Sequence, residues 1–383
     1  MKLNRAGVAA GVLIAAAAFA ACSSSGNSSK NTNSATNSGG ASPSTGGSAV
    51  ASTVACSSGT LNAEGSTAQT NAINQWIKDY QTACLKTNPT VNYNPTGSGA
   101  GVSKFTAGQV DFAGSDSALD PTKGEFAAAK KRCGSAPLDL PMVVGPIALA
   151  YNLKNVKDPV VLNGEVAANI FLGKIKSWDD PAIKALNKNV SLPATKISVF
   201  YRSDSSGTTQ NFERYLAATA PSIFTSKPDK DSSKAGFAGQ GQAKSQGVAD
   251  AISKTDGAIG YTEFSFAASS GLQTASIDNG GGPVVLSKNT ASKAAEAATV
   301  TGTGNDLSLK IDYATKTPGA YPLILVTYEI ACTKYTDPAK ATFVKDFLNY
   351  SVDGGQAALP KLGYAPLPTS LQAKVKASIS TIG

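Results

Sequence analysis

Residues 201–209 combine an arginine with hydroxyl and glycine residues in an order that suits the binding of an anion. The stretch reads Tyr-Arg-Ser-Asp-Ser-Ser-Gly-Thr-Thr and follows a β-branched and aromatic run, a pattern that predicts a strand, a turn and a helix start. The first N–H groups of a helix, here near Ser206, Gly207 and Thr208, lack internal partners and attract anions, and Arg202 adds a fork of charged donors. A capped helix beside a surface arginine would look the same. Other stretches must therefore decide between the two interpretations.

Two further turns also combine glycine with hydroxyl residues after a predicted strand. A short predicted strand runs into Gly65-Ser66-Thr67, and the periodic helix that follows places Thr67 near an N-cap. A second strand, 91–94, runs into the glycine-rich turn at 97–101, which suits an anion nest but also resembles an ordinary flexible loop. A third strand, 110–114, ends on Ser115-Asp116. Together with 201–209, these turns outline one site.

The composition removes several function classes. The chain of 383 residues contains no histidine, which excludes Ser-His-Asp and Cys-His catalytic pairs and histidine-based metal sites. We expect no metal and no cofactor. The net charge of +8 comes mostly from scattered lysines, without long runs of like charge or interleaved aromatic residues. This indicates a mildly basic surface and no nucleic-acid partner.

The N-terminal segment predicts export. Lys2 and Arg5 precede an apolar run that ends at Ala21, which is typical of a signal peptide over 1–21. The sequence Phe-Ala-Ala-Cys ending at Cys22 resembles a bacterial lipobox, so we expect Cys22 to be lipidated; an ordinary signal peptide followed by a chance cysteine is the alternative. The rest of 22–53 is rich in Ser, Gly and Asn and has no aromatic residue, which predicts a flexible tether.

The other four of the five cysteines predict two disulfides in an exported protein, with three possible pairings. Cys56 lies just before the first predicted strand, and Cys84 ends the helix that follows. A strand start and the end of its returning helix lie at the same edge of a βα unit. We therefore favour Cys56–Cys84, which leaves Cys133–Cys332.

Three later segments have sequence patterns that predict their local structure. The stretch 226–247 is rich in Gly, Lys, Ser and Gln and is interpreted as a surface loop. An Ala- and Lys-rich helical pattern covers 287–303, and an apolar stripe predicts a core helix over 336–349.

Seven stretches resemble, in order and approximate spacing, the phosphate-binding subunits of bacterial phosphate ABC importers. The resemblance covers roughly Leu61 to Pro368. The matching stretches are Gly65–Thr67, Gly97–Gly101, Val110–Asp116, Ile170–Pro181, Arg202–Thr208, Gly257–Tyr261 and Ala320–Leu323.

This resemblance implies an α/β, two-lobe fold of the periplasmic-binding-protein type (type II), with two crossing hinge strands and the ligand in the cleft between the lobes. Lobe one would comprise 54–141 plus 327–383, and lobe two 142–326. The crossings would lie near 142–148 and 321–326. Long apolar, β-rich runs at both places support this independently, although ordinary central strands would look alike.

The resemblance also implies a set of phosphate ligands. Arg202 would be oriented by Asp204, and Ala68 stands where family members commonly have an aromatic residue. The implied contacts are Thr67, the backbone of Ala68, Ser98, Asp116, Arg202, Ser206, Gly207 and Thr208.

Asp116 is the most informative member of this set. An acidic side chain facing a dianion is unfavourable unless the ligand brings a proton, which hydrogen phosphate does and sulfate does not.

The leading hypothesis is a non-enzymatic receptor that binds inorganic phosphate and delivers it to the transmembrane subunits of an ABC permease. It would be a monomer on the outer face of the cell membrane, attached through its lipid anchor only. The alternatives are a receptor for another oxyanion such as sulfate or molybdate, a phosphatase or phosphoryl transferase, and a phosphate sensor or surface adhesin.

Overall fold

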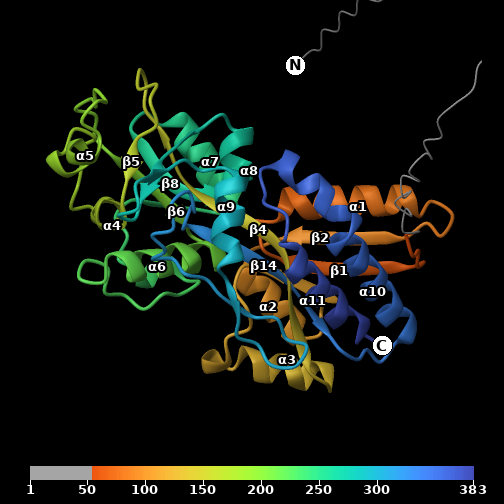
Figure 1. Cartoon of the computed structure of the whole chain (residues 1–383). Helices are drawn as coiled ribbons and strands as arrows, with labels where there is room; N and C mark the ends of the chain where they lie inside the picture. The colour runs from red at the N-terminus through yellow and green to blue at the C-terminus, as the bar shows by residue number, and fades with distance from the viewer. Residues whose placement is uncertain (1–53) are drawn as a thin grey trace, which may run out of the picture. The chain divides into compact units, whose positions relative to one another are not determined.

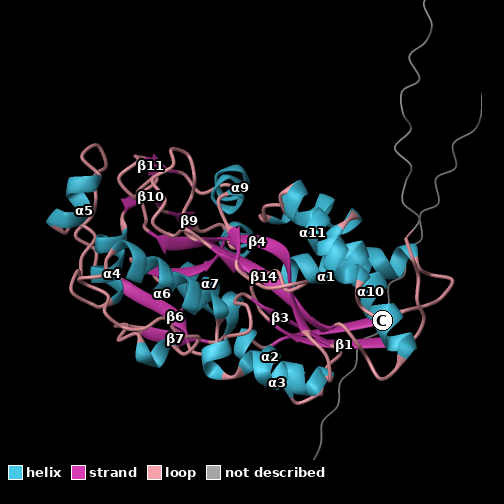
Figure 2. Ribbon diagram, turned by 60° about the horizontal axis from the view of Figure 1, so that its bottom comes forward, coloured by secondary structure: helices cyan, strands magenta, loops and turns pink. Residues whose placement is uncertain are grey.

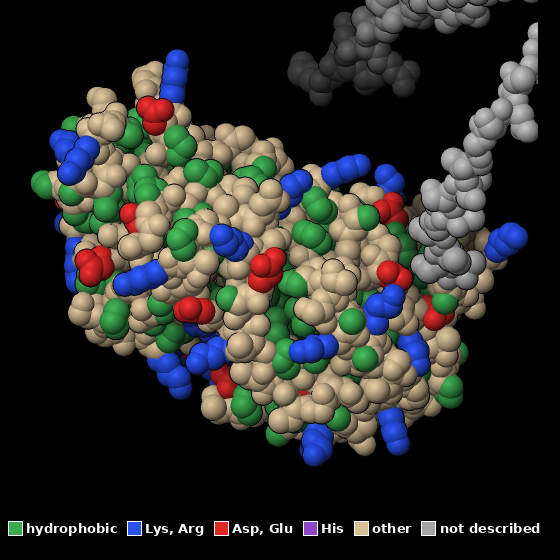
Figure 3. Space-filling view, viewed as in Figure 1, with side chains coloured by type: hydrophobic (Ala, Val, Ile, Leu, Met, Phe, Trp, Pro, Cys, Tyr) green, Lys and Arg blue, Asp and Glu red, His purple; other side chains and the backbone are tan. Residues whose placement is uncertain are grey.

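The computed structural model describes residues 54–383. The predicted signal peptide, Cys22 and the tether lie outside these residues. Within 54–383, no helix has both the length and the apolar character needed to cross a membrane. Lysine and arginine side chains are interspersed with acidic ones over the face shown in Figure 3.

A nine-stranded mixed sheet runs through the described part of the chain (Figure 1). Its order is β2-β1-β3-β14-β4-β8-β6-β7, and β9 also pairs with β4. The bounds are β1 Thr60–Gly65, β2 Thr90–Pro95, β3 Phe112–Ser115, β4 Pro137–Asn152, β6 Ser198–Arg202, β7 Gln240–Gln242, β8 Ala258–Glu263, β9 Gln273–Thr274 and β14 Ile324–Cys332.

Strands β4 and β14 connect the two halves of this sheet. The first part of β4 pairs with β14, which also pairs with β3, and the second part of β4 pairs with β8 and β9. Fifteen of the sixteen residues of β4 are buried, which explains its almost continuous apolar sequence. The predicted crossing strands are thus present. The return strand begins at Ile324 rather than Tyr321, because Pro322 has no N–H to donate to a ladder.

Helices cover both faces of the β1–β3 part of the sheet (Figure 2). Helix α1 buries Ile73, Trp76 and Tyr80 at helical spacing, and Tyr80 packs on Phe343 and Phe347 of α10. The helices are α1 Thr70–Ala83, α2 Ser98–Thr106, α3 Glu125–Cys133, α4 Gly164–Phe171, α5 Pro181–Leu186, α6 Gly207–Thr219, α7 Lys244–Lys254, α8 Phe264–Ser269, α9 Lys288–Glu296, α10 Pro338–Val352 and α11 Thr369–Ser380.

Short elements complete the described part of the chain. They are the strands β5 Val161–Leu162, β10 Ser276–Asp278, β11 Pro283–Val284, β12 Thr299–Val300 and β13 Leu309–Lys310, with the 3-10 helices η1 Pro121–Lys123, η2 Ser232–Lys234 and η3 Gly354–Leu362.

Two sequence interpretations need correction. The segment 226–247 is not only a surface loop, since it contains η2, β7 and the start of α7. The helical pattern at 287–303 ends at Glu296, and β12 follows it. Helix α1 begins at Thr70 with Gln69 as its N-cap, so Thr67 lies two residues before the cap, near it as predicted. The core helix expected over 336–349 is confirmed as α10.

Both predicted disulfides are confirmed, Cys56–Cys84 and Cys133–Cys332, each with a Cα–Cα distance of 5.4 Å. They close segments of very different length, with sequence separations of 28 and 199 residues.

We expect the double variant Cys133→Ser/Cys332→Ser to lose more stability than Cys56→Ser/Cys84→Ser. Chain entropy alone predicts losses of about 5 and about 3.5 kcal/mol, because the longer loop restricts the unfolded chain more. Urea titration followed by circular dichroism measures both losses, and each variant serves as the other's control. Equal losses, or the reverse order, would show that native contacts around the bridges outweigh loop length.

Candidate anion-binding site

The turn between β6 and α6 has the predicted geometry. Strand β6 ends at Arg202, and Ser206 caps α6 by accepting a hydrogen bond from the Thr209 N–H at 3.2 Å. The N–H groups of Gly207 and Thr208 have no backbone acceptor among the described residues, although both residues are buried. Two buried donors at a helix start form a site for an anion.

Arg202 is held in one orientation. Its side chain is almost fully buried; Nε donates to Asp204 Oδ1 at 2.7 Å, and Nη2 donates to Asp204 Oδ2. The third nitrogen, Nη1, donates to Ser245 Oγ at 3.1 Å. Burial alone would raise the pKa of Asp204, but its hydrogen bond and ion pair with Arg202 outweigh burial and hold that pKa below its usual value. Asp204 therefore orients the Arg202 guanidinium, as the sequence predicted, and its role in supporting a ligand stays a prediction.

Asp116 is buried and surrounded by hydroxyl groups. Its Oδ1 accepts from Ser66 Oγ and from Thr327 Oγ1 at 2.8 Å, and its Oδ2 accepts from Ser98 Oγ at 3.0 Å. Burial, followed by the nearby charge of Glu263, raises the pKa of Asp116 to about 6, against the lowering effect of the three hydroxyls. Asp116 is therefore mostly ionised at neutral pH and able to accept a proton from a ligand.

The turns contributed by the two predicted lobes are in direct contact. Thr67 Oγ1 lies 2.8 Å from Ser245 Oγ, and Asn211 Nδ2 donates to the Asp116 carbonyl at 2.7 Å. A Cβ atom on Gly207 would lie 2.7 Å from Asp116 Cβ, so only glycine permits this approach. The helix start of α6 is thereby brought against the carboxyl group of Asp116.

Seven predicted ligands meet in this place: Thr67, Ser98, Asp116, Arg202, Ser206, Gly207 and Thr208. The backbones of two predicted contacts are engaged within the fold. The Ala68 N–H donates to Ser66 Oγ at 3.0 Å, and the Ser206 N–H donates to the Lys230 carbonyl at 2.8 Å. At the start of α6, therefore, Gly207 and Thr208 are buried residues whose N–H groups have no backbone acceptor among the described residues.

The sequence reasoning missed several side chains that contact this set, and Ser245, Thr327 and Glu263 are among them. Ser245 lies in the segment interpreted as a loop, and Thr327 lies on β14. Glu263 ends β8, and its Oε1 accepts from Thr208 Oγ1 at 2.5 Å. Because β8 pairs in parallel with β6, its last residue lies at the same sheet edge as Arg202. The strand pairing that places Glu263 there has no local signal in the sequence.

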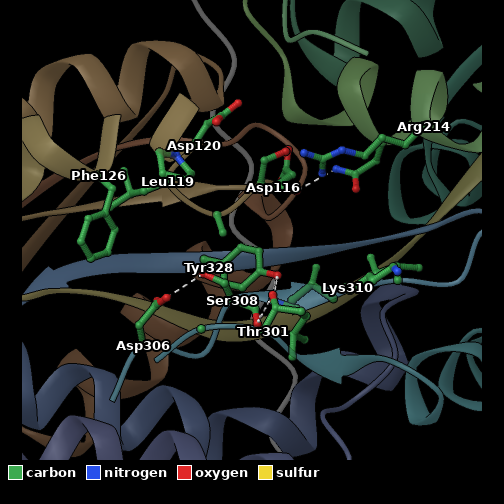
Figure 4. Close-up of a pocket in the computed structure, with 18 of the residues that line it drawn as sticks. Asp116, Leu119, Asp120, Phe126, Arg214, Thr301, Asp306, Ser308, Lys310 and Tyr328 are labelled. Atoms are coloured by element: carbon green, nitrogen blue, oxygen red, sulfur yellow. Dashed lines mark hydrogen bonds between the residues drawn. The ribbon is translucent and has the colours of Figure 1, made fainter. Parts of the chain in front are cut away.

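A cavity of about 740 Å³ adjoins Asp116 (Figure 4). The segment after β3 forms one wall, and the hairpin that includes Thr301 and Ser308 forms another. Arg214 and Lys310 are the cationic residues that line it. It shares Asp116 with the predicted site, but its lining includes none of residues 201–208.

Comparisons with known proteins identify the family. Residues 50–354 match the family model described as a PBP superfamily domain. The chain is 42% identical over 386 residues to the phosphate-binding protein PstS 3 of Mycobacterium tuberculosis H37Rv, with 100% of both chains covered. It is 41% identical over 326 residues to PstS 2 of the same organism, covering 84% of this chain and 87% of the relative.

A solved structure shows the same fold. The phosphate-bound periplasmic phosphate-binding protein PfluDING matches with a TM-score of 0.67 at 24% identity, covering 83% of this chain and 93% of the other. The chain therefore has the two-lobe α/β fold of the PBP superfamily and belongs to its PstS-type phosphate-binding proteins.

Proposed function

We propose that this protein is a non-enzymatic extracytoplasmic receptor that binds inorganic phosphate and delivers it to an ABC permease. The names of the PstS relatives support this proposal. The observation that carries it is the meeting of Arg202, the open N–H groups of α6 and the acceptor Asp116 in one buried place.

The proposed binding mode uses directed hydrogen bonds more than net charge. Asp204 already neutralises Arg202, so the guanidinium acts mainly as an oriented donor. The N–H groups of Gly207 and Thr208 would donate to further phosphate oxygens. The proton of hydrogen phosphate would be donated to Asp116. In a receptor for sulfate or molybdate, that carboxylate would have no ligand proton to accept.

Two proposals concern the organisation of the protein. Lobe one would comprise 54–141 plus 327–383, and lobe two 142–326, closing around the ligand. Ion pairs between Lys123 and Asp229 at 3.1 Å and between Lys230 and Glu125 at 2.8 Å would join the two lobes. The signal peptide, the tether and lipidated Cys22 would place the receptor on the outer face of the cell membrane as a monomer.

The function is tested by calorimetric titration of ligand-free protein with phosphate, arsenate and sulfate. We expect one phosphate per chain, competition by arsenate, and sulfate binding weaker by at least about 100-fold, as expected for a site that leaves a buried acceptor unpaired. Absence of phosphate binding, or sulfate binding of equal strength, would contradict the proposal.

The anchor is tested with Cys22→Ala. We expect the variant to leave the membrane fraction or to stay unprocessed, because stable anchoring requires a pair of lipid chains. Membrane fractionation and electrophoretic migration measure this, with Ser44→Ala in the predicted tether as a control outside the signal. A Cys22→Ala protein that fractionates and migrates as the parent does would rule out the lipid anchor.

A further inference from the structure

Lys230 is a buried lysine in direct contact with the turn between β6 and α6. Only 4% of the residue is exposed, and lysines are rarely buried unless they are paired. Its carbonyl accepts the N–H of Ser206, the cap residue of α6, at 2.8 Å. Two residues further on, Ser232 Oγ donates to the Arg202 carbonyl at 2.5 Å. The segment 230–232 is therefore fixed to the turn at which we propose that phosphate binds.

The side chain of Lys230 bonds to a carboxylate of the other proposed lobe. Its Nζ donates to both oxygens of Glu125, at 2.8 and 3.1 Å. The exposed fraction of the side chain is 6% for Lys230 and 17% for Glu125, so the pair is largely shielded from water. Glu125 begins α3, and its Oε2 also accepts the Asp120 N–H at 2.8 Å. Lobe one thus holds the carboxylate in the orientation that Lys230 of lobe two needs.

A second ion pair joins the same two segments but is less well placed. Lys123 lies 3.1 Å from Asp229, and the Lys123 side chain is 35% exposed. Asp229 also pairs with Lys234 of its own lobe at 3.0 Å. Exposed and shared ion pairs contribute little. The pair of Lys230 with Glu125 is therefore the stronger of these two contacts.

This pair distinguishes a closed arrangement of the lobes from an open one. If the lobes separate, both charges return to water, so the pair favours only the closed state. Removal of one partner leaves the other charge poorly paired in the closed state and solvated in the open state. A receptor that closes around its ligand must open before it releases the ligand. Loss of the pair should therefore appear mainly as faster release.

We propose that Lys230 is a positioning residue that couples the turn before α6 to lobe one and slows the release of bound phosphate. Its carbonyl holds Ser206, its ammonium group holds Glu125, and neither group is a predicted phosphate ligand. This inference rests on the proposed function and lobe boundaries, because it assumes that phosphate binds at the start of α6 and leaves when the lobes separate.

The test measures the release of radiolabelled inorganic phosphate from loaded protein into excess unlabelled phosphate, by rapid filtration. We expect Lys230→Met and Glu125→Gln each to raise the release rate about tenfold or more, as for one partner removed from a shielded charge pair. The association rate should change less than about threefold, because substitutions of this kind act mainly on dissociation.

A double variant distinguishes coupling between the lobes from local damage to the turn. If Lys230 acts through Glu125, Lys230→Met should cause no further acceleration in a Glu125→Gln protein. The control is Lys340→Met, which breaks the ion pair of Lys340 with Asp111 at 3.2 Å. Both partners of that pair lie in lobe one, so the control should release phosphate at the parental rate.

The outcomes separate this inference from the proposed function. Release at the parental rate from Glu125→Gln, accelerations that multiply in the double variant, or equal acceleration in Lys340→Met would overturn the role of Lys230 and leave the receptor intact. A parent that retains no radiolabelled phosphate would overturn the proposed function itself. If Lys230→Met does not fold, Glu125→Gln measured against the control decides alone.

Discussion

Replacing Arg202 with lysine will weaken phosphate binding by about 1–3 kcal/mol, or roughly 5- to 150-fold, the range for a charge-assisted hydrogen bond. Lysine keeps the charge but loses the planar fork that Asp204 now holds through two nitrogens. An ammonium group bonded to Asp204 cannot also reach Ser245 and the ligand in the same geometry. Asp204 would then be incompletely neutralised beside the anion.

The control for this substitution is Arg132→Lys. Arg132 contacts the Phe105 ring, with its guanidinium carbon 4.6 Å from the ring centroid, and donates to the Val110 carbonyl at 2.9 Å. It touches none of the predicted ligands, so its replacement should leave phosphate affinity unchanged. Titration of both variants at fixed pH and ionic strength gives the comparison. Equal affinity of Arg202→Lys and the parent would place Arg202 outside the site.

Asp116→Asn will reduce the preference for phosphate over sulfate at least about tenfold, chiefly through a gain in sulfate affinity. In the parent, sulfate oxygen and the Asp116 carboxylate would meet without a proton between them, which costs several kcal/mol in a buried place. The amide of asparagine offers an N–H there. Ser66, Thr327 and Ser98 can keep the new side chain in place, since their hydroxyls act as donors or acceptors.

Paired titrations of the parent and Asp116→Asn with both anions measure this ratio. Asp120→Asn is the control, because Asp120 lines the adjoining cavity and its side chain caps η1. It should leave the ratio unchanged. If Asp116→Asn excludes sulfate as strongly as the parent does, another group causes the discrimination, and the assignment of Asp116 as the acceptor for the ligand proton is wrong.

The sequence was sufficient to predict the part of the site that is local along the chain. Strand β6, the cap at Ser206 and the pair of Arg202 with Asp204 all lie within nine residues, where backbone propensity and capping chemistry decide the structure. The resemblance to a known family supplied Thr67, Ser98 and Asp116. The disulfides followed from the order of strands and helices.

The parts that were missed depend on contacts between distant segments. Ser245 belongs to a segment whose Gly, Ser and Gln content suggests a loop, but parallel pairing of β7 with β6 orders the segment just before α7. Thr327 reaches Asp116 because β14 lies between β3 and β4. Strand order in a sheet is set by packing of the whole chain, so neither residue has a local signal.

The glycine-rich turn at 97–101 shows a different limit. Its sequence suggested an anion nest, but the Gly99 N–H donates to the Ser205 carbonyl at 3.1 Å, and a Cβ atom on Gly99 would lie 1.9 Å from Ser205 Oγ. Gly99 therefore allows the turn at 97–101 and the turn before α6 to approach each other closely. Glycines that bind a ligand and glycines that pack against another loop have the same sequence pattern.

The central claim is that one phosphate binds between Arg202, the start of α6 and Asp116, and a crystal structure of the protein saturated with phosphate tests it most directly. We predict one tetrahedral anion there, with Arg202 Nη1 and the N–H groups of Gly207 and Thr208 donating to it and a short contact to Asp116. A phosphate found instead in the adjoining cavity beside Arg214 and Lys310, with these N–H groups still open, would contradict the account.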